Sequence, residues 1–133
     1  MSQRCLVDTN ILLRFLMGDP PELAERARDL VTLADSGKVE LRVPSLIVAE
    51  VVFTLESFYD VPKAVICQKL ELFLRSRGIV PLEPVIFDAL NRYSKHAVHF
   101  ADAYLAASAA AQGIPVYSFD EDFKRFKDIE WRH

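Results

Sequence analysis

A carboxylate, a hydroxyl and an amide follow one another as Asp8-Thr9-Asn10, at the point where an apolar segment, residues 5–7, gives way to a second one. A further acid, Asp120, directly follows the apolar stretch PVYSF. Such side chains can cap the next helix, because their oxygens accept hydrogen bonds from its free N–H groups. They can also bind a hard cation or take a proton from a substrate. For Asp8 we favour the chemical role, because Thr9 or Asn10 can equally cap the helix. Asp120, taken alone, is interpreted as an N-cap.

Two more acids, Glu50 and Asp102, lie inside predicted helices. Glu50 shares a helix face with Thr54 and Ser57, which fits either an exposed strip or the wall of a cleft. Asp102 lies in the first turn of its helix, where the helix dipole favours an acid without any function. The alanines that follow are small enough to let this helix approach the sheet closely and hold Asp102 near its rim. Asp122 is a weaker candidate.

The elements that position these acids alternate between short apolar strands and helices. The expected strands span 4–7, 40–43, 79–82, 115–119 and 129–131, and the expected helices span 10–17, 19–37, 44–60, 61–78, 84–97 and 100–113, with a short helical segment around residue 123. Asp19 and Ser45 are the predicted N-caps of the second and third helices. This alternation predicts an α/β fold with a central, mainly parallel sheet whose binding crevice lies at the strands' carboxyl ends. Asp8 and Asp120 should therefore share one rim.

Four acids gathered at one rim would repel one another, by ~4 kcal/mol for two charges ~4 Å apart at an effective dielectric of about 20. A bound cation removes that penalty. Carboxylate ligands without thiolate or imidazole suit Mg²⁺ or Mn²⁺. We therefore predict a magnesium or manganese site, in which Thr9 and Asn10 orient Asp8 or bind water and phosphate.

The composition limits the class of protein. The chain has 133 residues, 51% of them apolar, which indicates one folded domain over residues 1–133. No apolar run approaches the ~20 residues of a membrane span, and from the acid at position 8 and the short apolar stretch we expect no secretory signal. Cys5 and Cys67 are typical of buried reduced thiols, so we expect a cytoplasmic protein, although a disulfide between them stays open. The net charge of −3 opposes a polyanionic partner, but four of the negative charges belong to the predicted site.

Four motifs together resemble a known family. The segment VDTNILLRF, the helix around Glu50, HFADAYLAASAAAQG and PVYSFDEDF resemble, in that order, the PIN-domain nucleases and among them the VapC-type toxins of toxin–antitoxin pairs. The resemblance implies a three-layer α/β/α sandwich and a metal-dependent ribonuclease. It assigns the acidic quartet to Asp8, Glu50, Asp102 and Asp120, with Asn10 and Ser118 as supporting groups. Glu56 is the fallback for Glu50.

The expected reaction is hydrolysis of an RNA phosphodiester with one or two metal ions. Asp8, Asp102 and Asp120 would be ligands, and Glu50 a ligand or the base that takes a proton from water. Basic residues are available for the RNA backbone: they are Arg14, Lys63, Arg75, Arg77, Lys95, Lys124, Arg125 and Lys127. The resemblance also implies a homodimer and an antitoxin partner. We expect that partner to bind apolar residues of helices 10–17 and 45–59, with Leu13 and Phe53 as test positions.

Four alternatives stay open or are set aside. A PIN-like module without turnover that binds RNA or protein, and a PIN nuclease without an antitoxin, both remain open. A transition-metal site at His96, His99 and Asp102 is disfavoured, because a helix start near residue 99 breaks their common face. A P-loop is unsupported, because none of the four glycines is clustered.

Overall fold

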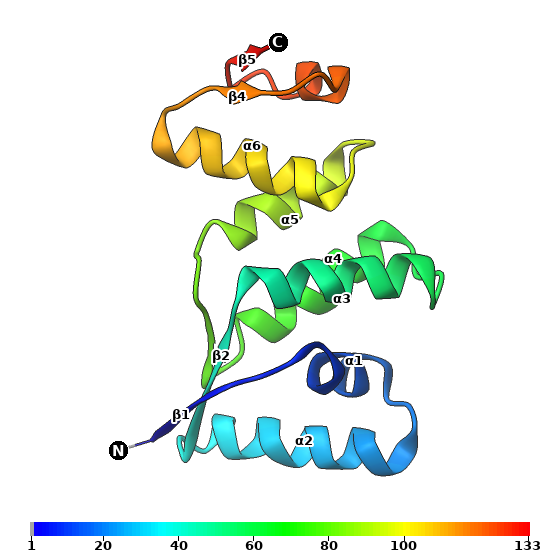
Figure 1. Cartoon of the computed structure of the whole chain (residues 1–133). Helices are drawn as coiled ribbons and strands as arrows, with labels where there is room; N and C mark the ends of the chain where they lie inside the picture. Colours follow the sequence, from blue (N-terminus) through cyan, green and yellow to red (C-terminus); the bar gives the residue numbers. More distant parts are fainter. Residues whose placement is uncertain (1) are drawn as a thin grey trace. The chain divides into compact units, whose positions relative to one another are not determined.

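The computed structural model describes residues 2–133, which form two compact units. The first unit ends at Glu83 and the second runs from Pro84 to His133. In the coloured ribbon the first unit extends from blue to green and the second from yellow-green to red (Figure 1). No helix of the described residues is both long and apolar enough to cross a membrane.

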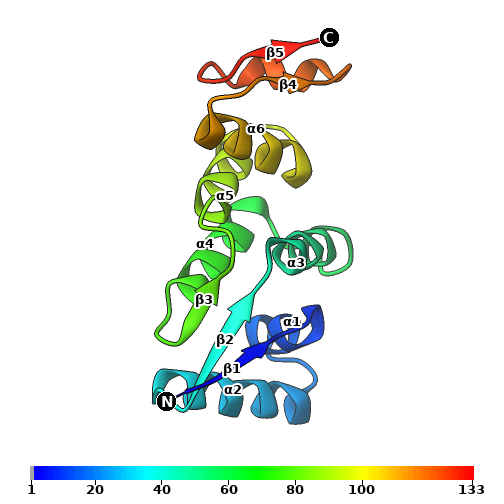
Figure 2. The same ribbon diagram turned by 60° about the vertical axis from the view of Figure 1, so that its left-hand side comes forward.

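The first unit is built on a three-stranded parallel sheet. Its elements are β1 (Gln3–Leu6), α1 (Thr9–Met17), α2 (Pro21–Asp35), β2 (Val39–Val43), α3 (Ser45–Ser57), α4 (Lys63–Leu74) and β3 (Ile79–Pro81). The strand order is β1-β2-β3, and Leu41 of β2 is in register with Cys5 of β1 and Ile79 of β3. β1 and β2 run side by side in the same direction (Figure 2). The prediction that strands alternate with helices and pair in parallel is therefore confirmed for this unit.

Helices and the sheet of the first unit share one apolar core. The fully buried side chains come from every layer of this unit: Leu12, Leu41, Val48, Val51, Leu55, Ile66 and Leu70. Cys67 is buried beside them and Cys5 is partly buried, and both are free thiols, as predicted. Burial raises the pKa of the Cys67 thiol to about 11, which keeps it protonated and unreactive at neutral pH.

The second unit places two helices beside a short parallel ladder. Its elements are α5 (Ile86–Lys95), α6 (Phe100–Gln112), β4 (Val116–Tyr117), the 3₁₀ helix η1 (Glu121–Arg125) and β5 (Trp131–Arg132), with β4 paired to β5. α6 packs mainly on α5 and also contacts β4 and η1. The buried alanines of α6, Ala103, Ala106 and Ala107, allow this close approach. The alanine-rich face of α6 therefore allows close packing on the helix α5 as well as on the strand β4.

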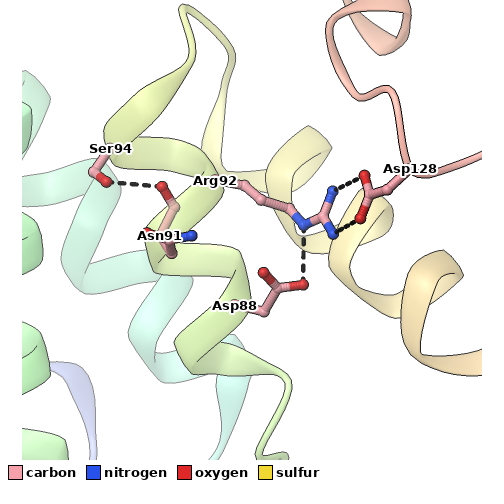
Figure 3. A network of polar contacts seen from close by, with 5 residues as sticks. All are labelled: Asp88, Asn91, Arg92, Ser94 and Asp128. Carbon is pink, nitrogen blue, oxygen red and sulfur yellow. Dashed lines mark hydrogen bonds and ion pairs between the residues drawn. The ribbon is translucent and has the colours of Figure 1, made fainter.

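A charged network fastens the segment after η1 to α5. Arg92 donates from Nε to Asp88 at 2.9 Å and from both terminal nitrogens to the two carboxylate oxygens of Asp128 (Figure 3). These bonds hold the pKa of the Asp128 carboxyl below its usual range. The Arg92 guanidinium also lies over the Phe126 ring, 5.5 Å from its centroid. The segment that follows Asp120 is thus held against a helix and not left as a free loop.

Two predicted helix caps are wrong. Pro20, not Asp19, precedes the first residue of α2, and its extended backbone takes the N-cap position without a side-chain bond. Pro44, not Ser45, does the same for α3, whose first residue is Ser45. The Ser45 N–H instead donates to Glu83 Oε1 at 2.8 Å, so an acid distant in the sequence satisfies this helix end. Most predicted strand and helix ends also differ from the observed ones by one or more residues.

The apolar surface is distributed differently from the prediction. Leu13 is only 6% exposed, because it faces the core of the first unit. Phe15 packs against Phe73, with 5.4 Å between ring centroids. On α3, by contrast, Leu46 and Phe53 are 69% and 70% exposed. Leu13 is therefore unsuitable for testing a docking surface, whereas Phe53 is suitable.

We predict that Gly78→Ala destabilises the first unit by at least ~3 kcal/mol. Gly78 has φ +82°, a conformation that strains any residue with a Cβ, and a Cβ there would lie 2.2 Å from the Ala34 carbonyl oxygen. The substitution therefore adds a shift of the Ala34 backbone to the conformational strain. Gly37→Ala is the matched control, because Gly37 has φ +83° and open space around its Cβ position. It should cost ~1–2 kcal/mol from strain alone. Urea titration measures both, and equal losses would refute the close contact.

Candidate active site

Three carboxylates converge in the second unit. Asp102 of α6, Asp120 before η1 and Asp122 within η1 each offer an oxygen atom, and these atoms all lie within 4.8 Å of one another. Asp102 and Asp122 are partly buried and Asp120 is exposed. The predicted neighbourhood of Asp102 and Asp120 is therefore present in the structure, with Asp122 as a third member. We call these residues the acidic cluster.

Backbone bonding fixes the acids of the cluster. Asp120 is the N-cap of η1, as predicted, and its Oδ1 accepts from the Asp122 N–H at 2.9 Å. The Asp120 N–H donates to Ser118 Oγ at 3.0 Å, and the supporting role of Ser118 stays a prediction. The Ser118 carbonyl in turn accepts from Trp131 Nε1 at 2.9 Å. Because the bond from the Asp122 N–H uses only Oδ1 of Asp120, the other carboxylate oxygen stays available to a ligand.

The electrostatics of the cluster favour a cation. Burial is the main cause that raises the pKa of the Asp102 carboxyl, and the Asp120 carboxylate adds to it. His99 opposes this shift and Asp122 reinforces it. Arg125 Nε lies 3.6 Å from Asp122 and compensates part of the charge. The donors are all oxygen atoms, so the cluster fits Mg²⁺ or Mn²⁺ better than a softer metal.

The site candidates Asp8 and Glu50 of the first unit each accept a hydrogen bond from the first turn of α1. Asp8 is the N-cap of that helix, and its Oδ1 accepts from the Ile11 N–H at 3.1 Å. Thr9 and Asn10, the other possible caps, are already helical and do not fill the N-cap position. Thr9 Oγ1 instead donates to Glu50 Oε2 at 3.0 Å, which links α1 to α3. This bond places Glu50 beside Thr9, which follows Asp8 in the chain. Glu50 is therefore a better candidate for the fourth site acid than the fallback, Glu56.

The predicted site residues thus form two groups. Asp8, Thr9, Asn10 and Glu50 belong to the first unit, and Asp102, Ser118, Asp120 and Asp122 to the second. The joint action of both groups on one metal stays a prediction. Sequence reasoning ranked Asp122 low because it looked exposed. The sequence did contain a signal for Asp122, which lies two residues after the predicted N-cap Asp120. An N-cap carboxylate accepts a hydrogen bond from the N–H at that position, which brings the two residues together.

The histidine alternative is not supported. His96 is the C-cap of α5, with its ring edge-on to Phe126, and His99 is the N-cap of α6. The two residues therefore belong to the ends of different helices, as the predicted helix start near residue 99 required. They do not share a helix face with Asp102.

The comparisons with known proteins assign the family. The PIN domain profile matches residues 5–129, and this chain belongs to the PIN domain family. Within that family it is similar to the VapC ribonuclease of Aquifex aeolicus (strain VF5), with 32% identity over 128 residues, 93% of this chain and 94% of that protein. These matches confirm the resemblance seen in the four sequence motifs and the α/β, PIN-like fold.

The chain also aligns with solved structures. One of them is the crystal structure of VapBC2 from Rickettsia felis bound to a DNA fragment from their promoter. The alignment has 17% identity, covers 99% of this chain and 98% of that chain, and has a TM-score of 0.38. Because this score is low, the family assignment rests on the sequence matches.

We predict that Mn²⁺ raises the melting temperature of the protein and that Asp102→Asn removes most of this increase. A cation at one hundred times its Kd stabilises the native state by ~2.7 kcal/mol if it binds only that state. Without metal, Asp102→Asn should melt higher than the wild type, because it removes a partly buried charge beside other acids. Differential scanning calorimetry in Mn²⁺ and in EDTA measures both effects.

The control is Asp29→Asn, which removes an exposed acid of α2 outside the cluster. It should respond to Mn²⁺ like the wild type. An Mn²⁺ response of Asp102→Asn equal to that of Asp29→Asn would contradict a metal site at the cluster.

Proposed function

We propose that this protein is a Mg²⁺- or Mn²⁺-dependent ribonuclease that hydrolyses RNA phosphodiester bonds. The observation that carries the proposal is the convergence of Asp102, Asp120 and Asp122 in a chain of the PIN domain family. The similarity to a VapC ribonuclease over almost the whole chain supports RNA as the substrate. Asp8 and Glu50 complete the proposed site from the first unit.

Each proposed site residue has a distinct task. Asp8, Asp102 and Asp120 hold the cation, and Glu50 either holds it or takes a proton from the attacking water. The hydrogen bond from Thr9 at 3.0 Å orients the Glu50 carboxylate for that task. When bound, the cation supplies positive charge that activates water and offsets charge growing on the phosphate. Ser118, Asn10 and Asp122 are positioning groups around these four acids.

The surface charges leave room for an RNA backbone. Three of the basic residues assigned to RNA have acidic neighbours: Arg75 pairs with Glu71, Lys124 with Glu121 and Arg125 with Asp122. Exposed pairs of this kind contribute only ~0–1 kcal/mol, so phosphates can replace the acids at little cost. The pairs therefore do not oppose RNA binding.

We predict that Asp8→Asn, Asp102→Asn and Asp120→Asn each reduce RNA cleavage at least ~100-fold, because each removes a charged ligand. Glu50→Gln should cost ~10²–10⁴-fold if Glu50 moves the proton. The measurement is gel-resolved cleavage of structured RNA with Mg²⁺, Mn²⁺ or EDTA. Circular dichroism confirms that each variant is folded.

Glu56→Gln is the matched control for Glu50→Gln, because it makes the same change on the same helix. It should cleave RNA like the wild type. Full activity of Glu50→Gln together with loss in Glu56→Gln would move the assignment to Glu56. A wild-type protein that binds RNA but never cleaves it would favour the module without turnover.

We also propose that an antitoxin protein binds the exposed apolar face of α3. Leu46, Glu50 and Phe53 follow at helical spacing, and all three are exposed. An apolar partner helix on this face would therefore approach Glu50 itself and could place a basic side chain against the site acids. The resemblance to VapC-type toxins supports an antitoxin as this partner. A homodimer and a cytoplasmic location remain predictions of the same resemblance.

Leu46→Asp and Phe53→Asp should each weaken antitoxin binding at least tenfold, by the ~1.4 kcal/mol or more expected for a buried contact residue. Leu72→Asp on α4 is the control, since Leu72 is 68% exposed and Leu46 is 69% exposed. Calorimetry with the protein encoded by the neighbouring gene measures these affinities. Wild-type affinity in both α3 variants would place the docking surface elsewhere, and absence of any such partner would favour a PIN nuclease that works alone.

A further inference from the structure

A cavity of about 400 Å³ lies between α1 and α2, within the first unit. The two helices pack against each other at the lower end of the ribbon (Figure 1). The cavity is lined by Asn10, Ile11, Arg14, Leu23, Arg26, Ala27 and Leu30. Its walls are mostly aliphatic, and its polar groups are two guanidiniums and one amide. This size and lining suit a small ligand with an apolar body and a negative charge.

The cations of the cavity lack counter-charges. None of the described residues that line the cavity is acidic. Arg14 donates from one terminal nitrogen to the Asp19 carbonyl at 3.2 Å, but its Nε is buried with no hydrogen-bond partner among residues 2–133. Arg26 makes no side-chain hydrogen bond or ion pair within the same residues. Because a buried donor without an acceptor is unfavourable, the site is suited to an anionic ligand that supplies one.

The cavity adjoins the start of α1 that carries Asp8. Its wall residue Ile11 donates from its N–H to Asp8 Oδ1 at 3.1 Å. Asn10, another wall residue, lies next to Thr9, which is bonded to Glu50. If an RNA strand presents one phosphate to Asp8 and Glu50, the nucleotide next to that phosphate is therefore within reach of Arg14 and Arg26.

We propose that this cavity binds a nucleotide of the RNA that flanks the cleaved bond. The inference rests on the proposed ribonuclease function and adds a substrate subsite to it. The flanking phosphate pairs with Arg26 and Arg14, which present forked donors to phosphate oxygens. The base or ribose lies on Ile11, Leu23 and Leu30, with a guanidinium plane available for stacking. An acidic peptide is the rival ligand, but proximity to Asp8 favours the nucleic acid.

The test compares charge-matched variants of one helix. Arg26→Gln removes a cavity cation whose side chain has no partner among the described residues, and Arg28→Gln removes an exposed cation of α2 outside this cavity. Leu23→Asn and Leu33→Asn form the second pair, because these leucines are 41% and 39% exposed and only Leu23 lines the cavity. The probe is a fluorescein-labelled RNA 10-mer in EDTA, and its binding is measured by fluorescence anisotropy at several salt concentrations.

We expect Arg26→Gln and Leu23→Asn to weaken RNA binding about fivefold or more, and Arg28→Gln and Leu33→Asn to leave it within twofold of the wild type. The slope of log K against log salt should fall by about 1 for Arg26→Gln relative to Arg28→Gln. Equal binding by the two members of each pair overturns the inference. So does an Arg26→Gln variant that loses affinity for the antitoxin but keeps it for RNA, because the cavity would then receive a protein.

Failure of the ribonuclease function gives a different result. If the wild type binds the RNA and Arg26→Gln weakens that binding, but Mg²⁺ or Mn²⁺ supports no cleavage, the subsite stands and the proposed catalysis fails. If the wild type cleaves RNA and Arg26→Gln binds the probe as tightly as the wild type, the catalysis stands and the subsite fails.

Discussion

Mutual repulsion among carboxylates is the constraint on which this structure depends. Three acids with oxygens within 4.8 Å of one another raise the free energy of the folded state unless a cation or a proton offsets their charge. Burial is the main cause of the raised pKa of Asp102, and the Asp120 and Asp122 carboxylates add to it, so part of that shift reflects the repulsion. The fold must therefore hold the cluster by other means, and it does so with the 3₁₀ helix, the Ser118 hydroxyl and the Arg92–Asp128 pair.

Helix starts are the device that holds these acids in place. Asp8 and Asp120 each cap a helix with one oxygen, 3.1 Å from the Ile11 N–H and 2.9 Å from the Asp122 N–H respectively. The structural and chemical roles, which the sequence presented as alternatives, are thus compatible. A cap orients the carboxylate through one oxygen and leaves the second free to bind a ligand. The positive end of a helix also lowers the cost of a charge there.

The sequence predicted the elements better than their ends, and the reason is local. Short apolar segments that alternate with helices identified the parallel strands around Leu41, because a strand buried in a parallel sheet is recognisable from its apolar run alone. The caps at Asp19 and Ser45 were wrong, since an extended proline can take the N-cap position and Glu83 is thirty-eight residues from Ser45, where no local pattern reaches it. Leu13 was mistaken for surface because only tertiary packing decides which side of an apolar helix faces the core.

The pairings that define the site were equally beyond local patterns. The Thr9–Glu50 bond joins residues 41 positions apart, and it was not predicted although both residues were. Acidic residue types and their order along the chain indicated the family and the chemistry. They did not reveal that Asp122 joins Asp102 and Asp120, because that depends on how η1 packs on α6.

The proposal that acids of both groups serve one metal ion is tested most directly by a double-mutant cycle for Mn²⁺ binding. Calorimetry would measure the affinity of the wild type, Asp8→Asn, Asp102→Asn and the double variant. We predict that each single change weakens binding at least tenfold and that the two effects are not additive, with a coupling of about 1 kcal/mol or more. Wild-type affinity in Asp8→Asn, with affinity lost in Asp102→Asn, would contradict a shared site.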